Sequence, residues 1–299
     1  MSAYDMAHSS GTFCWSLYAL PMTESITPRR FVASLPPDIP KHWLPGNELV
    51  SSLLNAYTIL VPANESFYIR TIQACLDHVE DDALRARCKR FVYQEAQHGS
   101  AHMRYWTNLD AQGYQFRDYE HAVDRYVFRV IERATPAWFR VSAVAAVEHI
   151  NAYMAEEFLA QDILAAAEPN VRDLMEWHFA EEIEHRSVAF DLLQAVEPSY
   201  IARIAGFGTT VVLFYGLMGT LAVRLLAQDG LLWRRRTGRQ LRDHLWSSHH
   251  MPRKTIRHVV DYLRPGFHPS QSKIDGFARL TLERLERTTP PKVVPTQRG

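Results

Sequence analysis

Residues 176–187 read EWHFAEEIEHRS, a stretch in which two histidines and four glutamates fall within ten residues. Successive residues of a helix are about 100° apart, so His178, Glu182 and His185 share one helical face. A solvated helix usually intersperses its acids with Lys or Arg four residues away. This stretch instead gathers acids and imidazoles along one stripe, which is typical of a metal site.

A Glu-x-x-His pair occurs in two separate parts of the chain. Glu95 and His98 form the sequence EAQH, and Glu182 and His185 form EIEH. This spacing puts one carboxylate and one imidazole on adjacent turns of a single helical face. One such pair arises often by chance, whereas two of them are a stronger indication of metal binding.

A lone glutamate precedes each pair at the distance expected for a helical hairpin. Glu65 lies within PANESFYI, 30 residues before Glu95, and Glu148 lies within AAVEHIN, 34 residues before Glu182. Both have mostly apolar neighbours, where an unpaired acid would be unfavourable. The chain therefore contains two helix pairs, each with Glu on its first helix and Glu-x-x-His on its second.

The remaining sequence has the periodicity of helices. No run alternates as strands do and Gly-rich turns are scarce, so we predict an all-α fold. A Glu on two helices and Glu-x-x-His on two others is typical of ferritin-like di-iron or di-manganese proteins. We therefore predict a ferritin-like four-helix bundle with extra C-terminal helices. Long helices are expected over about residues 47–79, 82–113, 137–167 and 171–195, with a shorter one over 119–133.

Composition divides the chain into four parts. Residues 1–46 form a proline-rich, irregular lead-in, 47–200 the di-metal bundle, 201–270 a hydrophobic helix with basic C-terminal helices, and 271–299 a C-terminal helix with a proline-containing tail. The net charge is zero, but residues 229–299 hold 15 Lys and Arg against 6 Asp and Glu, which leaves 18 against 27 elsewhere. An acidic bundle disfavours nucleic acid as a partner, and none is expected.

Cysteine usage and the N-terminal sequence indicate the compartment. The three cysteines, Cys14, Cys75 and Cys88, form no CxxC pair and no even framework. Reduced thiols in a cytoplasmic protein explain them most simply. The first residues lack a basic segment followed by a continuous apolar core, so no signal peptide is expected.

Residues 204–223 form an uncharged segment, bounded by Arg203 and Arg224, that is long enough to span a bilayer. One span cannot leave both the bundle and the basic tail in the cytoplasm. We therefore interpret the segment as a helix buried against the bundle or within a homodimer. The alternative is a helix at the inner face of the membrane, with the basic tail on anionic lipid.

Residues 27–270, including YLRPGFHP at 262–269, resemble a bacterial family of predicted metal-dependent hydrolases. The metal residues are also similar to those of ferritin-like di-iron N-oxygenases, which convert p-aminobenzoate-type arylamines to nitro compounds. In that family the last ligand helix carries His-x-x-x-Glu-x-x-His, as residues 178–185 do here. The resemblance implies a first shell of seven metal ligands: Glu65, Glu95, His98, Glu148, His178, Glu182 and His185.

Some of these residues keep a second interpretation. His178 is either a third histidine ligand or a histidine that supports the ligands or the core. Glu181 competes with Glu182 because it shares a face with His185, although the matched Glu-x-x-His spacing favours Glu182. Glu65 and Glu148 keep the interpretation of buried acids paired with Arg, and His102 and His149 are interpreted as outer-shell or ordinary histidines.

The chemistry of such a site leaves three functional hypotheses. Four carboxylates neutralise two divalent ions, and one imidazole per metal leaves positions open for O₂ or water. We first expect a non-haem di-iron oxygenase that takes electrons from a separate reductase and oxidises a small or apolar substrate by N-oxygenation, hydroxylation or desaturation. The alternative is a metal-dependent hydrolase with Mn or Zn and a metal-bound water. The third hypothesis is a non-enzymatic, ferritin-like metal-binding protein.

Overall fold

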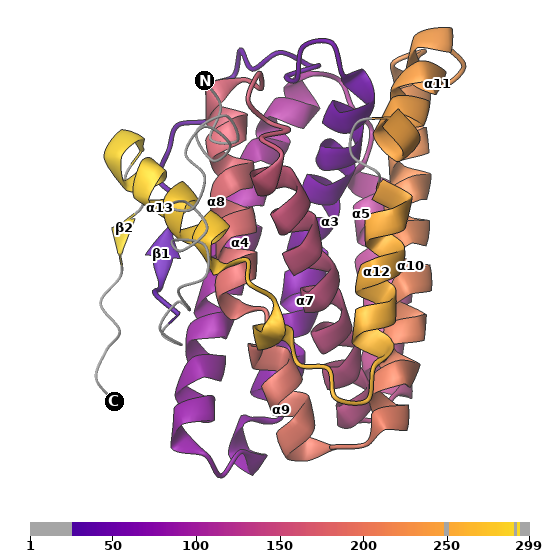
Figure 1. Cartoon of the computed structure of the whole chain (residues 1–299). Coiled ribbons are helices and arrows are strands. Elements are labelled where there is room, and N and C mark those ends of the chain that lie inside the picture. The colour runs from indigo at the N-terminus through magenta and orange to yellow at the C-terminus, as the bar shows by residue number, and fades with distance from the viewer. Residues whose placement is uncertain (1–25, 248–250, 290–291, 294–299) are drawn as a thin grey trace.

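The computed structural model describes residues 26–247, 251–289 and 292–293, and over these residues the protein is an all-α bundle, as predicted (Figure 1). Two short strands, β1 (Arg29–Arg30) and β2 (Lys292–Val293), pair antiparallel and bring the two ends of the described chain together. Residues 1–25 of the predicted lead-in, with Cys14, lie outside the described residues, as does most of the predicted tail. The division of the chain at residues 46, 200 and 270 stays a prediction.

Four long helices form the bundle: α3 (Glu48–Gln73), α4 (Asp82–Ala111), α7 (Ala137–Ala160) and α8 (Pro169–His185). α3 packs against α4, and α7 packs against α8. The two hairpins meet where α3 contacts α7 and α4 contacts α8. This arrangement confirms the two helix pairs predicted from the repeated Glu and Glu-x-x-His pattern.

Polar side chains cap the first turns of three of these helices, and a glycine turn follows α4. Asn47, Asp81 and Glu168 accept hydrogen bonds from first-turn backbone N–H groups of α3, α4 and α8, at 3.2, 2.8 and 2.9 Å. These caps satisfy N–H groups that have no partner within the helix. After α4 the chain turns at Gly113, whose φ of +86° is a left-handed conformation that favours glycine. Pro62 lies inside α3 without ending it.

The prediction of one continuous helix over residues 171–195 is wrong, because the helix ends at His185. α8 ends there, and α9 (Val188–Val196) begins three residues later. Arg186 at this break is buried and pairs with Asp275 of α13 (Asp275–Thr288), with Nη1 and Oδ1 2.8 Å apart. The ion pair holds the C-terminal helix against the end of α8.

Other predicted boundaries also shift. The first helix stops at Gln73 rather than near residue 79, and the third stops at Ala160 rather than near 167, shortly before Asp162 takes a φ of +49°. The shorter helix predicted over 119–133 consists of α5 (Arg117–Val123) and α6 (Arg129–Ala134), joined by a π-helical turn. None of these shifts moves a predicted ligand off its helix.

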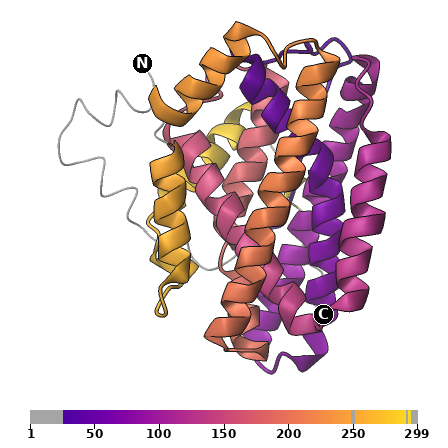
Figure 2. The same cartoon turned by 90° about the vertical axis from the view of Figure 1, so that its right-hand side faces the viewer.

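The C-terminal part adds helices along one side of the bundle: α10 (Tyr200–Gln228), α11 (Arg235–Arg242) and α12 (Met251–Leu263) (Figure 2). α10 packs on α7 and α3. At the α7–α10 crossing Gly206 faces Ser142, whose hydroxyl donates to the carbonyl oxygen of Ala202 at 2.8 Å. The small side chains let the two backbones approach closely.

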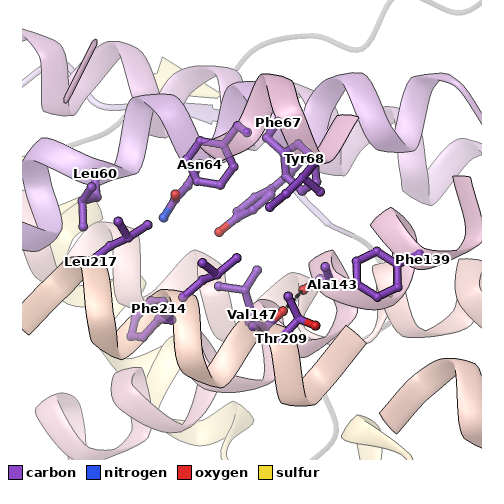
Figure 3. Close-up of a pocket in the computed structure, with 14 residues that line it drawn as sticks. Leu60, Asn64, Phe67, Tyr68, Phe139, Ala143, Val147, Thr209, Phe214 and Leu217 are labelled. Carbon is purple, nitrogen blue, oxygen red and sulfur yellow. Dashed lines mark hydrogen bonds between the residues drawn. The ribbon is translucent and has the colours of Figure 1, made fainter. Parts of the chain in front are cut away.

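α10 contains the uncharged segment at 204–223 and has the length and composition of a membrane-spanning helix. Of its most apolar stretch, 39% is buried in the bundle. One face therefore packs against the bundle, while the other exposes Val212 and Tyr215, so the helix is only partly buried. Contact with a second copy or with a membrane surface stays a prediction. A cavity lies between α3, α7 and α10 (Figure 3).

Candidate metal centre

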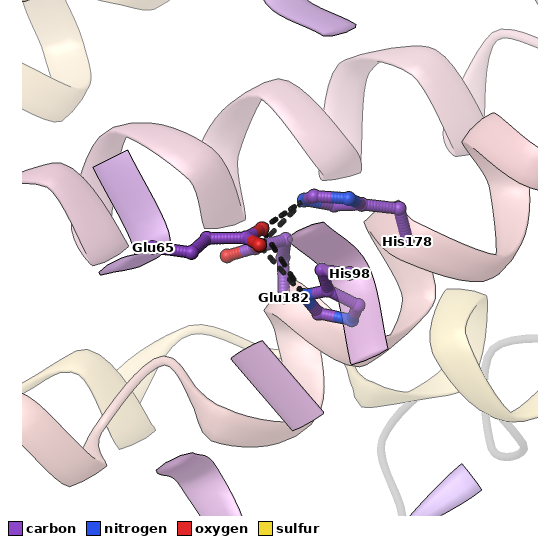
Figure 4. A group of neighbouring side chains, drawn as sticks. All are labelled: Glu65, His98, His178 and Glu182. Atoms are coloured by element: carbon purple, nitrogen blue, oxygen red, sulfur yellow. Dashed lines mark ion pairs between the residues drawn. The ribbon is translucent and has the colours of Figure 1, made fainter. Parts of the chain in front are cut away.

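The helical bundle gathers six of the seven predicted ligands into two overlapping groups. Each residue of a group offers one donor atom, and the donor atoms of a group lie within 4.8 Å of one another. His98 and Glu182 belong to both groups, and every member is buried. One group, shown in Figure 4, is Glu65, His98, His178 and Glu182, and the other is Glu95, His98, Glu182 and His185.

His98 of α4 sits at the junction of the two groups. Its Nδ1 lies 3.6 Å from Glu65 Oε1, 3.7 Å from Glu182 Oε1 and 3.9 Å from Glu95 Oε2. These separations are longer than hydrogen bonds. They leave space among one imidazole nitrogen and three carboxylates from α3, α4 and α8.

Glu181 contacts the other ring nitrogen of His98, Nε2. His98 Nε2 lies 3.0 Å from Glu181 Oε2, and Glu181 Oε1 is 3.3 Å from the guanidinium of Arg29. A carboxylate that accepts the Nε2–H of a histidine orients the ring and leaves Nδ1 free to bind a metal. Glu181 therefore lies behind His98, whereas Glu182 belongs to both donor groups.

His178 faces the first group through Nε2, which lies 2.7 Å from Glu182 Oε1 and 2.9 Å from the hydroxyl of Tyr57. Behind it, Nδ1 of His178 lies 2.8 Å from Nε2 of His102, and the other ring nitrogen of His102 lies 3.1 Å from Thr58 Oγ1. His178 thus points toward the centre and His102 lies behind it. A role for His102 as an outer-shell histidine stays a prediction.

Glu148 of α7 lies beside the second group without belonging to either set of donors. Its Oε2 is 2.8 Å from Nδ1 of His185, whose Nε2 is 3.4 Å from Glu95 Oε1. The other carboxylate oxygen, Oε1, is buried without a hydrogen-bond partner. The structure brings Glu148 to the edge of the centre, and its role as a ligand stays a prediction.

Unpartnered polar atoms provide a test of whether these residues fit metal ions. A buried polar atom without a partner destabilises a fold, so native proteins contain few of them. Such atoms occur in several parts of the described residues, and seven of them gather among the predicted ligands. These seven are carboxylate oxygens or imidazole nitrogens, which are donors for divalent metals. They are Glu65 Oε2, both carboxylate oxygens of Glu95, His98 Nδ1, Glu148 Oε1, Glu182 Oε2 and His185 Nε2.

The electrostatics of the centre also favour bound metal ions. Burial, reinforced by the neighbouring carboxylates, raises the pKa of Glu65, Glu95 and Glu148 well above the usual range. Burial also lowers the pKa of His178 to about 3 and that of His98 well below its usual value. Without cations, burial therefore favours the protonated form of the acids and the neutral form of the imidazoles, whereas two divalent ions would neutralise four carboxylates.

Two neighbours of the centre were not predicted from the sequence. Tyr57 contacts His178, although it lies eight residues before Glu65 and its only sequence signal is a place two turns away on the same helix. Gly99 follows His98, and a Cβ there would lie 3.1 Å from Glu65 Oε2. Glycine at this position leaves room for the Glu65 carboxylate.

Three further titratable residues have partners outside the centre. Asp162 pairs with Arg172, Asp191 contacts Arg87 and His268, and His149 binds the backbone carbonyl of His258. None of these contacts involves a predicted ligand.

Comparison with known proteins identifies the family. A family model described as "Predicted metal-dependent hydrolase" matches residues 27–273. The chain belongs to this family. No curated protein and no solved structure matches the chain. For this predicted metal-dependent hydrolase, the buried Glu and His side chains provide a site suited to divalent metal ions, whose identity the donor types leave open.

Proposed function

We propose that the protein is a hydrolase with a dinuclear metal centre held by the predicted ligands. The observation that carries this proposal is the pair of buried donor groups that share His98 and Glu182. Two groups with shared donors suit two ions side by side. Membership in the predicted metal-dependent hydrolase family supports hydrolysis as the reaction.

Bound divalent ions would supply Lewis acidity and an activated water as nucleophile. The residues of the chain itself hold the donors in place. Glu181 accepts the Nε2–H of His98, so that the Nδ1 lone pair faces the other donors. His102 contacts the far nitrogen of His178 in the same manner. The bundle keeps bulk water away, since the donor side chains are buried.

A second candidate is the oxidation of an organic substrate by O₂ with two irons. The donor set favours it, because four glutamates with Glu-x-x-His pairs are typical of di-iron carboxylate bundles. His178, Glu182 and His185 also match the ligand pattern of the ferritin-like N-oxygenases. This reaction requires O₂ and an electron donor, whereas hydrolysis requires neither.

Metal dependence and O₂ dependence separate the two candidates. Metal-free protein is loaded anaerobically with Zn²⁺, Mn²⁺ or Fe²⁺ and given a panel of neutral ester and amide substrates. Hydrolysis without O₂, lost in His98→Ala, is the result that the proposal predicts. O₂ uptake by the reduced Fe²⁺ form, with no hydrolysis under any metal, would favour the oxygenase. Metal uptake with neither reaction would indicate a metal-binding protein.

A further inference from the structure

The cavity between α3, α7 and α10 encloses about 560 Å³, its open mouth included. Its walls are mostly apolar. The aromatic side chains of Phe67, Phe139 and Phe214 are among those that line it (Figure 3). None of the fourteen residues that line it carries a charge.

Four of the lining residues are polar, and the hydroxyls of Thr209 and Thr210 donate to backbone carbonyl oxygens. The other two offer polar groups to the apolar cavity. The amide of Asn64 and the hydroxyl of Tyr68 extend from adjacent turns of α3 toward α10 (Figure 3). Neither side chain has a hydrogen-bond partner among the described residues. An apolar pocket with a few convergent polar groups is the usual form of a ligand site.

The cavity adjoins the candidate metal centre along two helices. Asn64 and Tyr68 flank Glu65 on α3, and Val147 of the cavity wall immediately precedes Glu148 on α7. Tyr68 is buried, and its pKa is raised by that burial and by the charges of Glu148 and other carboxylates of the centre. Tyr68 therefore lines the cavity from a position about one helical turn after Glu65.

We propose that this cavity binds the apolar part of a neutral substrate, with its polar linkage held by Asn64 and Tyr68 beside the metal centre. An anion such as a phosphate ester does not fit, because no cationic side chain lines the wall to offset its charge. The class expected is an ester or amide of an apolar acid. The reactive linkage in this inference rests on the proposed hydrolase function, whereas binding of the apolar part does not.

Hydrolysis of such a substrate balances with water alone. Water gives a hydroxyl to the acyl carbon and a proton to the departing oxygen or nitrogen, so that an acid and an alcohol or amine result. No oxidant or reductant is needed.

The test begins with binding of prodan, a neutral apolar fluorophore, to the metal-loaded full-length chain. Leu213→Trp fills the cavity from α10, and Val212→Trp places the same side chain at the adjacent residue, which is 72% exposed and does not line the cavity. We expect Leu213→Trp to weaken binding by about tenfold or more, equivalent to about 1.4 kcal/mol, and Val212→Trp to bind like wild type. Unchanged helicity and metal content would show that both variants fold.

Equal binding by all three proteins would overturn the cavity assignment, as would no binding by wild type or equal loss in both variants. Turnover is then measured on p-nitrophenyl acetate, octanoate and phosphate. The proposal predicts faster hydrolysis of the octanoate than the acetate, loss of that preference in Leu213→Trp, and no phosphate release. Selective prodan binding with no ester turnover would reject the hydrolase function but leave the cavity inference intact.

Discussion

At the scale of single residues, Glu181 is the side chain that best distinguishes orienting a metal ligand from binding the metal itself. It contacts the nitrogen of His98 that faces away from the other donors. Glu181→Gln keeps the shape but replaces by an amide the carboxyl group that orients His98, and loss of such a partner weakens metal binding by about 10- to 100-fold. Metal affinity is measured by competition with a chelator.

Glu176→Gln is the matched control, because Glu176 lies on the same helix, is nearly buried and pairs with Arg172 and Arg284 away from the centre. Equal affinity in wild type and both variants would mean that Glu181 has no role in holding His98.

Among the predicted ligands, His178 is the residue whose role was least determined by the sequence. Its Nε2 points at Glu182 within the first donor group. If it binds a metal, His178→Ala should lower the affinity of one ion by more than the roughly 100-fold expected for an outer residue. Titration with Co²⁺, followed by its visible absorption, reports the two ions separately. His149→Asn, at a buried histidine bonded to the His258 carbonyl, is the control. If His178→Ala binds both ions with unchanged affinity, His178 is a supporting residue and not a ligand.

The sequence predicted the donors because their spacing is local. Glu95 and His98, or Glu182 and His185, are brought together by one helical turn, whatever the rest of the fold does. The support behind them was not predictable in this way. Glu181 and His98 are 83 residues apart, and Arg29 and Glu181 are 152 apart, so no local period connects them.

At the scale of helices, the close approach of two backbones is tested at Gly206 of α10. A Cβ there would lie 2.7 Å from the backbone carbon of Ser142 on α7. Because a backbone atom cannot move aside cheaply, Gly206→Ala should destabilise the fold by about 1–3 kcal/mol. Thermal unfolding followed by circular dichroism measures the change.

Gly208 provides the contrast on the same helix, since a Cβ there meets nothing within 4 Å. Gly208→Ala should raise the free energy of unfolding by about 0.5–1 kcal/mol through helix propensity. A Gly206→Ala variant as stable as Gly208→Ala would show that α10 does not pack on α7 as described.

Helix boundaries were predicted less well than helix positions, and the break after His185 shows why. Nothing in the local pattern of residues 171–195 ends a helix at that point. The break coincides with Arg186, which pairs with Asp275, 89 residues along the chain. A tertiary ion pair of this kind cannot be predicted from hydrophobic periodicity, which reports only on residues within a few helical turns.

At the scale of the whole molecule, the metal centre should couple folding to metal and to protons. The carboxyl pKa values of Glu65, Glu95 and Glu148 are raised by burial, so in the metal-free protein these groups keep their protons to a higher pH than free carboxyl groups do. Metal binding must then release protons, and its affinity must fall as the pH falls. Calorimetric titration in buffers of different ionisation enthalpy counts the protons. An observed enthalpy independent of the buffer would contradict this coupling.

Metal removal should also lower the melting temperature. A ligand present at 100 times its dissociation constant stabilises a fold by about 2.7 kcal/mol. The loss on chelation should be much smaller in His98→Ala, because His98 contributes to both donor groups. Equal melting temperatures with and without metal would mean that the ions bind outside the folded centre.

The metal content of the purified protein tests the central claim most directly. Elemental analysis of the full chain, with protein concentration from amino-acid analysis, should find about two divalent ions per chain, as expected for a dinuclear site. The same measurement on His98→Ala should find fewer. Absence of stoichiometric metal in wild type, even after loading with Fe²⁺, Mn²⁺ or Zn²⁺, would contradict a dinuclear metal centre.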